Sequence, residues 1–106
     1  MSILQRFNLA GSVAIVTGSG RGIGRAIALA YADAGADVVC SARSLEDIEA
    51  VAEEVRSRGR RALALSCDVT DSEQRRALVS NAREQMGRIT HLVNNAGGGG
   101  PNDPLK

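Results

Sequence analysis

The sequence is poor in aromatic residues, and this scarcity limits both its core and its function. The 106 residues include one Phe, one Tyr and no Trp, so we predict a core of Ala, Val, Leu and Ile side chains. Proteins that bind single-stranded nucleic acid stack its bases on several aromatic rings. Phe7 and Tyr31 alone do not provide such a platform, and we expect no nucleic-acid partner.

An excess of charge of either sign is also missing. The chain has 13 basic and 12 acidic residues, a net charge of +1, which is typical of one ordinary globular domain over residues 1–106. Arginines are dense only between Arg56 and Arg61. We interpret this run as a solvated turn at a helix end, where arginine compensates the helix dipole.

No hydrophobic run is long enough to cross a membrane. The longest uncharged stretch, Phe7 to Gly20, is interrupted by polar residues and glycines, whereas a membrane span needs about 18 apolar residues. Arg6 interrupts the only apolar stretch near the start, so we see no secretion signal and expect a cytoplasmic protein without a membrane partner. Cys40 and Cys67 have no metal-binding spacing, and we predict buried, reduced thiols and no metal site.

Apolar runs and helical segments alternate regularly along the chain. The run at residues 13–17 is typical of a strand buried on both faces of a parallel sheet, and residues 37–42 repeat this pattern. Residues 62–67 and 89–93 are predicted to be the third and fourth strands. The segments between them are predicted helices, at residues 23–34, from Ser44 to Gly59 and from Asp71 to Gly87. Ser44 to Asp47 resembles a capping box. The second helix is expected to bury one face, made of Leu45, Ile48, Val51, Ala52 and Val55.

This order predicts an α/β fold, a Rossmann-type doubly wound parallel sheet of which only the N-terminal β-α-β-α-β-α-β portion is present. Residues 94–106 are polar and rich in Gly and Pro, and we expect a loop there in place of a fifth strand. In a complete doubly wound sheet the fourth strand would be interior. Its outer edge should therefore be unpaired in this incomplete domain.

Glycines gather between the first strand and the first helix, from Thr17 to Gly24. There Gly18 can make the tight turn, Gly22 lets the backbone approach a pyrophosphate, and Gly24 lets the helix pack against the strand. Free N–H groups at a helix N-terminus attract anions. The position of this loop predicts a dinucleotide phosphate site, with a purely structural glycine turn as the alternative. A P-loop is excluded because no Gly-Lys-Ser/Thr sequence occurs.

Three motifs in this order, Thr17-Gly-x-x-x-Gly-x-Gly24, Asp68-Val69 and Asn94-Asn-Ala-Gly97, resemble the short-chain dehydrogenase/reductase family. The resemblance implies a nicotinamide dinucleotide cofactor. It implies that the adenosine phosphates are surrounded by Gly18, Ser19, Gly20, Arg21, Gly22, Ile23 and Gly24. It further implies that Asp68 and the Val69 backbone contact the adenine, and that the ribose and nicotinamide side is lined by Asn95, Ala96 and Gly97.

The choice of cofactor can be argued from charge. An NAD site needs a carboxylate about 20 residues beyond the glycines to bind the ribose 2′-OH, whereas an NADP site has a cation nearby. The second predicted strand ends in Ser41-Ala42-Arg43, without an acid, and Arg21 lies in the glycine loop. We therefore predict NADP(H), with NAD(H) possible and a solvated Arg43 as the alternative.

The catalytic residues that the resemblance implies are missing from this sequence. In that family a Tyr-x-x-x-Lys pair and a Ser lie after the Asn-Asn-Ala-Gly motif, but here Gly35 follows the single tyrosine, Tyr31, and the only lysine is Lys106. We expect the cofactor-binding part of an oxidoreductase that interconverts a secondary alcohol and a ketone, with no catalytic residue in this chain. The loop from Asn95 to Pro101 resembles that of some bacterial hydroxysteroid dehydrogenases.

Two other hypotheses remain open at this point. A truncated, non-catalytic nucleotide-binding or regulatory module would carry the same motifs, and a partial reading frame without a stable fold would expose the same strand edge. Family members commonly form dimers and tetramers through later helices, so the parent protein is a candidate oligomer. Tyr31 and His91 are expected to be packing residues, and Thr90 stands where the family often has Asp.

Overall fold

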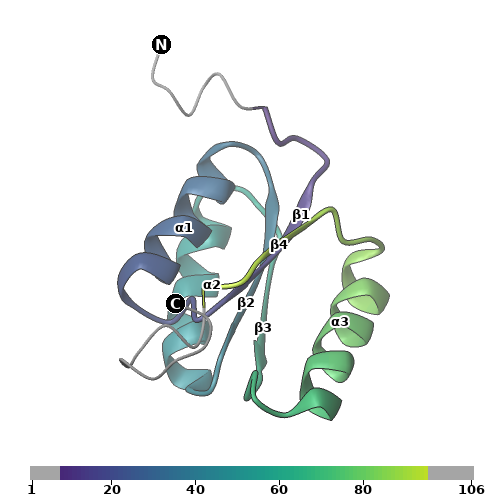
Figure 1. Ribbon diagram of the computed structural model, residues 1–106. Helices are drawn as coiled ribbons and strands as arrows, with labels where there is room; N and C mark the ends of the chain where they lie inside the picture. Colours follow the sequence, from purple (N-terminus) through teal and green to yellow (C-terminus); the bar gives the residue numbers. More distant parts are fainter. Residues whose placement is uncertain (1–7, 96–106) are drawn as a thin grey trace.

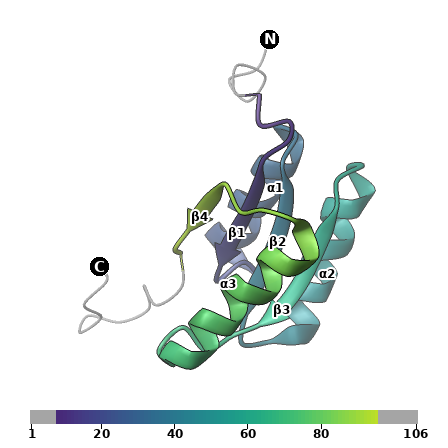
Figure 2. The same ribbon diagram turned by 90° about the vertical axis from the view of Figure 1, so that its right-hand side faces the viewer.

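Four parallel strands form one sheet in the computed structural model, which describes residues 8–95 (Figure 1). The strands are β1 (Val13–Thr17), β2 (Asp37–Ala42), β3 (Ala62–Ser66) and β4 (His91–Val93), in the order β3-β2-β1-β4. Helices α1 (Gly22–Asp33) and α2 (Leu45–Ser57) cover one face, and α3 (Ser72–Met86) covers the other (Figure 2). The predicted fold class is confirmed.

Both faces of the sheet are packed at β1 and β2, which explains the apolar residues at successive positions of these two strands. All five residues of β1 are buried. Val16 and Val38 face the cluster that includes α1 and α2, whereas Ile15 and Val39 face the cluster that includes α3. Because alternate residues of a strand point to opposite faces, a sheet covered on both sides needs apolar side chains at successive positions.

The predicted caps of α2 and α3 are present. The Ser44 hydroxyl accepts a hydrogen bond from the Asp47 backbone N–H at 3.3 Å, and Asp71 accepts bonds from the first turn of α3. Ile48 and Val55 are buried as expected. The expectation for Leu45 was wrong, because this first residue of α2 is 49% exposed and lines a solvent-open hollow beside β3 and α3.

Some strand boundaries differ from the expected ones. The strand expected at residues 89–93 begins only at His91. Thr90 contacts Val13 of β1 both through its N–H, which donates to the Val13 carbonyl at 2.9 Å, and through its hydroxyl. The Thr90 hydroxyl accepts a bond from the Val13 N–H at 2.9 Å and lies 3.1 Å from the Val13 carbonyl oxygen. Regular pairing then starts at Ala14 and His91. The third strand ends at Ser66, one residue before Cys67, and α1 is shifted by one residue.

One long edge of the sheet is formed by β4. Among the described residues β4 pairs only with β1, as expected for the fourth strand of an incomplete sheet, and Leu92 is 61% exposed. The His91 and Tyr31 rings meet edge to face with centroids 5.8 Å apart, so both residues pack as predicted.

The dense arginines after α2 take part in local contacts. Arg58 Nε lies 2.8 Å from an Asp33 carboxylate oxygen, and Arg61 Nε lies 3.0 Å from one of Asp37. These contacts join the end of α2 to α1 and β2, in keeping with a structural turn. No helix within residues 8–95 is long and apolar enough to cross a membrane. Cys40 and Cys67 are free and buried, as predicted.

Candidate functional site

A hollow of about 670 Å³ lies where the carboxyl ends of β1, β2 and β3 meet. Parallel strands bring their carboxyl ends to one edge, and the crevice at that edge is where doubly wound folds bind ligands. The predicted site residues that line it are Gly18, Gly20, Arg21, Arg43, Val69 and Asn95. The fold therefore brings together residues up to 77 positions apart in the sequence.

The glycine loop has the backbone geometry that a phosphate cradle requires. Gly18 and Gly22 have φ angles of 64° and 60°, in the left-handed region that glycine adopts without strain. Gly24 has a different role, because a Cβ on it would lie 1.9 Å from the Gly18 carbonyl oxygen and 2.6 Å from Asn95 Nδ2. The first turn of α1 thus packs directly on the end of β1, as the sequence predicts.

The N-terminus of α1 faces this loop without a cap of its own. Arg21 is the N-cap residue and its side chain makes no capping hydrogen bond, and the first turn contains no acid. Helices α2 and α3 have both a side-chain cap and an acid in the first turn. The first N–H groups of a helix have no partner within it, so α1 retains donors and a positive dipole end for an anion.

A hydroxyl at the end of β1 connects the loop to the segment after β4. Thr17 Oγ1 accepts a bond from the Asn95 N–H at 3.0 Å and lies within hydrogen-bond distance of the Asn94 side chain. Asn95 Nδ2 in turn donates to the Gly18 carbonyl oxygen at 3.3 Å. The Asn94-Asn95 pair is thereby fixed beside the glycine loop.

Ser19 fastens the loop to β2. Its hydroxyl accepts a bond from the Ser41 N–H at 2.9 Å, and its own N–H donates to the Ser41 carbonyl at 3.1 Å. The side chain is completely buried. Ser19 therefore shapes the loop from below, and its hydroxyl is directed to β2 rather than to the hollow.

Charges of both signs surround the hollow. Arg21 Nη2 lies 3.4 Å from Asp47 Oδ2, with side chains 87% and 38% exposed. The pKa of Asp68 is lowered, chiefly by hydrogen bonds from the Thr70 hydroxyl and N–H and further by the positive charge of Arg43. Two arginines and two carboxylates therefore share this end of the sheet.

The remaining predicted site residues lie around the hollow or outside residues 8–95, which the structure describes. Gly22, Gly24 and Ile23 form the start of α1, where Ile23 is 74% exposed, and Asp68 follows β3 next to Val69. The predictions for Ala96 and Gly97 fall outside residues 8–95.

Five residues that line the hollow were not predicted as site residues from the sequence: Ala42, Ser44, Asp47, Cys67 and Thr70. Each lies within four residues of a predicted site residue. The positions where the predicted strands end could therefore have indicated these residues. Burial raises the pKa of the Cys67 thiol above its usual value of 9.0, with the Asp68 charge acting in the same direction. Cys67 thus contributes a neutral wall to the hollow at neutral pH.

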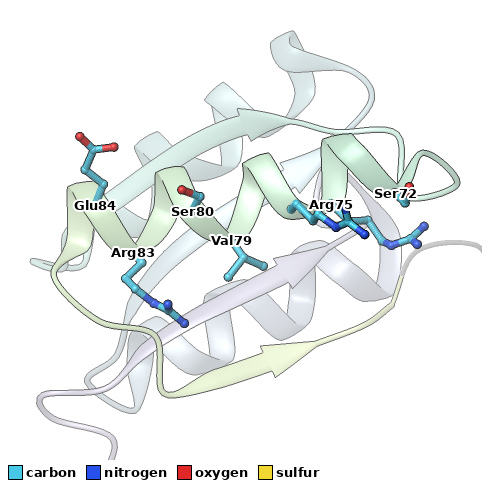
Figure 3. Close-up of a pocket in the computed structure, with 7 residues that line it drawn as sticks. Ser72, Arg75, Val79, Ser80, Arg83 and Glu84 are labelled. Carbon is cyan, nitrogen blue, oxygen red and sulfur yellow. The ribbon is translucent and has the colours of Figure 1, made fainter.

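A second hollow, also about 670 Å³, lies along α3 (Figure 3). Its lining side chains all come from that one helix and include Arg75, Val79 and Arg83. None belongs to the glycine loop or to a strand end. Its volume alone therefore does not make it the candidate site.

Comparison with known proteins agrees with this geometry. A family model described as short chain dehydrogenase matches residues 12–106. The chain belongs to the short-chain dehydrogenase family. Within this family it is 45% identical over 103 residues to an uncharacterised oxidoreductase of Mycobacterium tuberculosis, covering 97% of this chain and 39% of the relative. It is 44% identical over 97 residues to the 7α-hydroxysteroid dehydrogenase of Escherichia coli, covering 92% of this chain and 38% of that enzyme.

The fold of this short-chain dehydrogenase segment is also similar to solved structures. A crystal structure of hydroxysteroid dehydrogenase from Escherichia coli superposes with a TM-score of 0.86 at 40% identity, covering 95% of this chain and 44% of the other. A short-chain alcohol dehydrogenase structure from Sinorhizobium meliloti gives a TM-score of 0.82 at 45% identity, covering 86% and 36%. The chain spans about two fifths of the length of the curated relatives named above.

Proposed function

We propose that the chain is the cofactor-binding part of an NADP(H)-dependent short-chain oxidoreductase that interconverts a secondary alcohol and a ketone. The family uses nicotinamide dinucleotides, and the turn with Gly18 and Gly22, at the uncapped start of α1 that Gly24 packs against β1, fits a pyrophosphate. The cofactor would supply hydride transfer. We assign no catalytic role to residues 1–106.

The residues at the end of β2 support the preference for NADP(H), which has a 2′-phosphate. Ala42 ends β2 where an NAD site would have a carboxylate, and Arg43 follows it at the rim of the hollow. None of the ion pairs within residues 8–95 includes Arg43. A guanidinium in that position can form charge-assisted hydrogen bonds with a phosphate.

The test is a comparison of dissociation constants for NADPH and NADH in wild-type protein and in Arg43→Ala. We expect NADPH to bind more tightly, and Arg43→Ala to weaken NADPH binding by about 10- to 100-fold, since hydrogen bonds to charged groups contribute about 1.5–3 kcal/mol. NADH binding should change little. Arg60→Ala is the matched control, because Arg60 contacts the Gly35 carbonyl at the opposite end of β2. Tighter binding of NADH by wild-type protein would contradict the proposal.

A non-catalytic nucleotide-binding module is the second candidate, favoured by the lack of a Tyr-x-x-x-Lys sequence in the 106 residues. Reading the encoding DNA past the codon for Lys106, together with an intact mass, separates the two. A frame that continues into Ser and Tyr-x-x-x-Lys supports the oxidoreductase. A stop codon and a mass matching 106 residues support the module.

The proposal also includes a cytoplasmic location and an oligomeric parent protein. The location rests on the two free thiols, Cys40 and Cys67. Fractionation of the source cells and light scattering of the purified protein are the corresponding measurements. NADP(H) and a small alcohol or ketone are the expected partners.

A further inference from the structure

Asp47 is the acidic residue that lines the nucleotide hollow together with Arg21 and Arg43. Its carboxylate contacts Arg21, at 3.4 Å between Oδ2 and Nη2. The sequence motifs give Asp47 no role in binding, and in α2 it belongs to the first turn, where an acid stabilises the helix dipole. Its side chain nevertheless faces the same space as both arginines.

Backbone contacts fix the position of Asp47. Its N–H donates to the Ser44 hydroxyl at 3.3 Å, which caps α2. On the other side, a Cβ placed on Gly20 would lie 2.9 Å from Asp47 Cβ, so the glycine loop passes directly against this residue. The carboxylate would therefore stay at the hollow even if its contact with Arg21 were broken.

The Arg21–Asp47 pair is one of three ion pairs that connect α1 and its N-cap to α2 and its C-cap. The other two, Arg25–Glu54 and Asp33–Arg58, follow the helices away from the hollow. Their residues do not line the hollow. A phosphate entering the hollow therefore meets only the first of these pairs.

We propose that Asp47 is a specificity-determining residue that limits the preference of this site for a 2′-phosphate. This inference rests on the proposed function. Asp47 acts in two ways: it holds the Arg21 guanidinium in an ion pair, and it places a negative charge beside the group that Arg43 attracts. A 2′-phosphate must compete for Arg21 and overcome that repulsion, whereas a 2′-hydroxyl does neither.

The size of the effect follows from the exposure of the pair. An exposed ion pair changes an equilibrium by a factor of about two to five, and repulsion of a phosphate with a charge of about −1.5 to −2 adds to it. We expect Asp47→Asn to increase discrimination about two- to tenfold at low salt. The increase should shrink at 0.5 M salt, where the screening length falls to roughly 4–5 Å.

The experiment compares two probes that differ only in the 2′-phosphate, adenosine 2′,5′-bisphosphate and adenosine 5′-monophosphate. Their dissociation constants are measured by calorimetry in the protein that the reading frame encodes. The readout is the dissociation constant of the monophosphate divided by that of the bisphosphate, so that a higher ratio means a stronger preference for the 2′-phosphate. A general loss of folding affects both probes alike and leaves this ratio unchanged. Asp47→Asn leaves the cap of α2 intact, since the cap uses the Asp47 backbone. Glu46→Gln is the matched control, as it removes the same charge from the same helix turn outside the hollow.

The outcomes separate this inference from the proposed function. A wild-type ratio that favours the bisphosphate and falls in Arg43→Ala supports NADP(H), whatever Asp47→Asn does. The inference is supported if Asp47→Asn then raises the ratio while Glu46→Gln does not. It is overturned if Asp47→Asn leaves the ratio unchanged or if Glu46→Gln raises it equally. A wild-type ratio near one that Arg43→Ala does not alter overturns the proposed function, and the inference with it.

A double variant tests the route through Arg21. If Asp47 acts partly by holding this side chain, Asp47→Asn should raise the ratio less in an Arg21→Ala background than in the wild type. An equal increase in both backgrounds would overturn the role of the Arg21 ion pair. Repulsion between Asp47 and the 2′-phosphate would then be the only remaining route.

Discussion

Replacing Gly24 by alanine provides a sharp test of the packing between α1 and β1, because two effects predict opposite signs. Alanine favours a helix over glycine by about 1 kcal/mol, so helix propensity alone predicts a more stable protein. The structure predicts the reverse. The new Cβ would lie 1.9 Å from the Gly18 carbonyl oxygen, where real Cβ atoms stay beyond 3.0 Å. The first turn of α1 must then move by about 1 Å.

Such a shift has a calculable consequence. Overpacking of this kind costs about 1–3 kcal/mol, and loss of the Asn95–Gly18 hydrogen bond adds about 1 kcal/mol. After the propensity gain is subtracted, we expect Gly24→Ala to lower the free energy of unfolding by about 1–3 kcal/mol. Nucleotide affinity should fall as well, because the same turn presents the free N–H groups.

The assay is urea unfolding followed by circular dichroism, with nucleotide titration alongside. Ala50→Gly, at an exposed position within α2, measures the propensity contribution in this protein, with an expected loss of about 1 kcal/mol. If Gly24→Ala proves as stable as the wild type or more stable, the close approach of α1 to β1 is refuted.

Three further predictions concern single contacts. Thr90→Val should lower the free energy of unfolding, measured in urea, by about 1–3 kcal/mol, because the Val13 N–H loses its hydrogen-bond acceptor. Thr90→Ser keeps the hydroxyl and should retain most of the wild-type stability. Equal losses in the two variants would contradict a role for the hydroxyl. Because hydrogen bonds from Thr70 lower the pKa of Asp68 below 3.8, its contribution to stability is present above pH 3.8 and is lost as the pH falls through the lower folded-state value. Carboxyl NMR titration should show a midpoint below 3.8 that rises in Thr70→Val, and an unchanged midpoint would count against the assigned cause. Burial raises the pKa of Cys40 to about 11, so iodoacetamide at pH 8 should label it slowly in native protein and rapidly in urea; rapid native labelling would show that the thiol is accessible.

The order of elements was predictable because local patterns determine it. The β-branched run of β1 and the glycines that end each helix are signals within a few residues of each other. The role of Gly24 could also be predicted, since its spacing from Gly18 places it on the first helical turn beneath the strand. These features depend on chain geometry that every such loop shares.

Contacts between distant segments were not predictable in the same way. Asp47 reaches the hollow because the Gly20 backbone passes against it, and no local pattern reports that approach. Leu45 has the right helical spacing for burial, yet it is 49% exposed beside an open hollow between α2, β3 and α3. Thr90, just before β4, bonds to Val13 in a strand 77 residues away, and no local pattern reports that contact either.

The hollow is closed by two contacts of very different range. Ser19 bonds to a residue 22 positions along the chain, whereas Thr17 bonds to Asn95, 78 positions away. Loop-closure entropy makes the longer contact about 1 kcal/mol more costly to form. Docking of β4 therefore completes the proposed nucleotide site, and a nucleotide that requires the closed hollow would stabilise the docked strand by mass action. Nucleotide affinity would then also measure how firmly β4 is attached to β1.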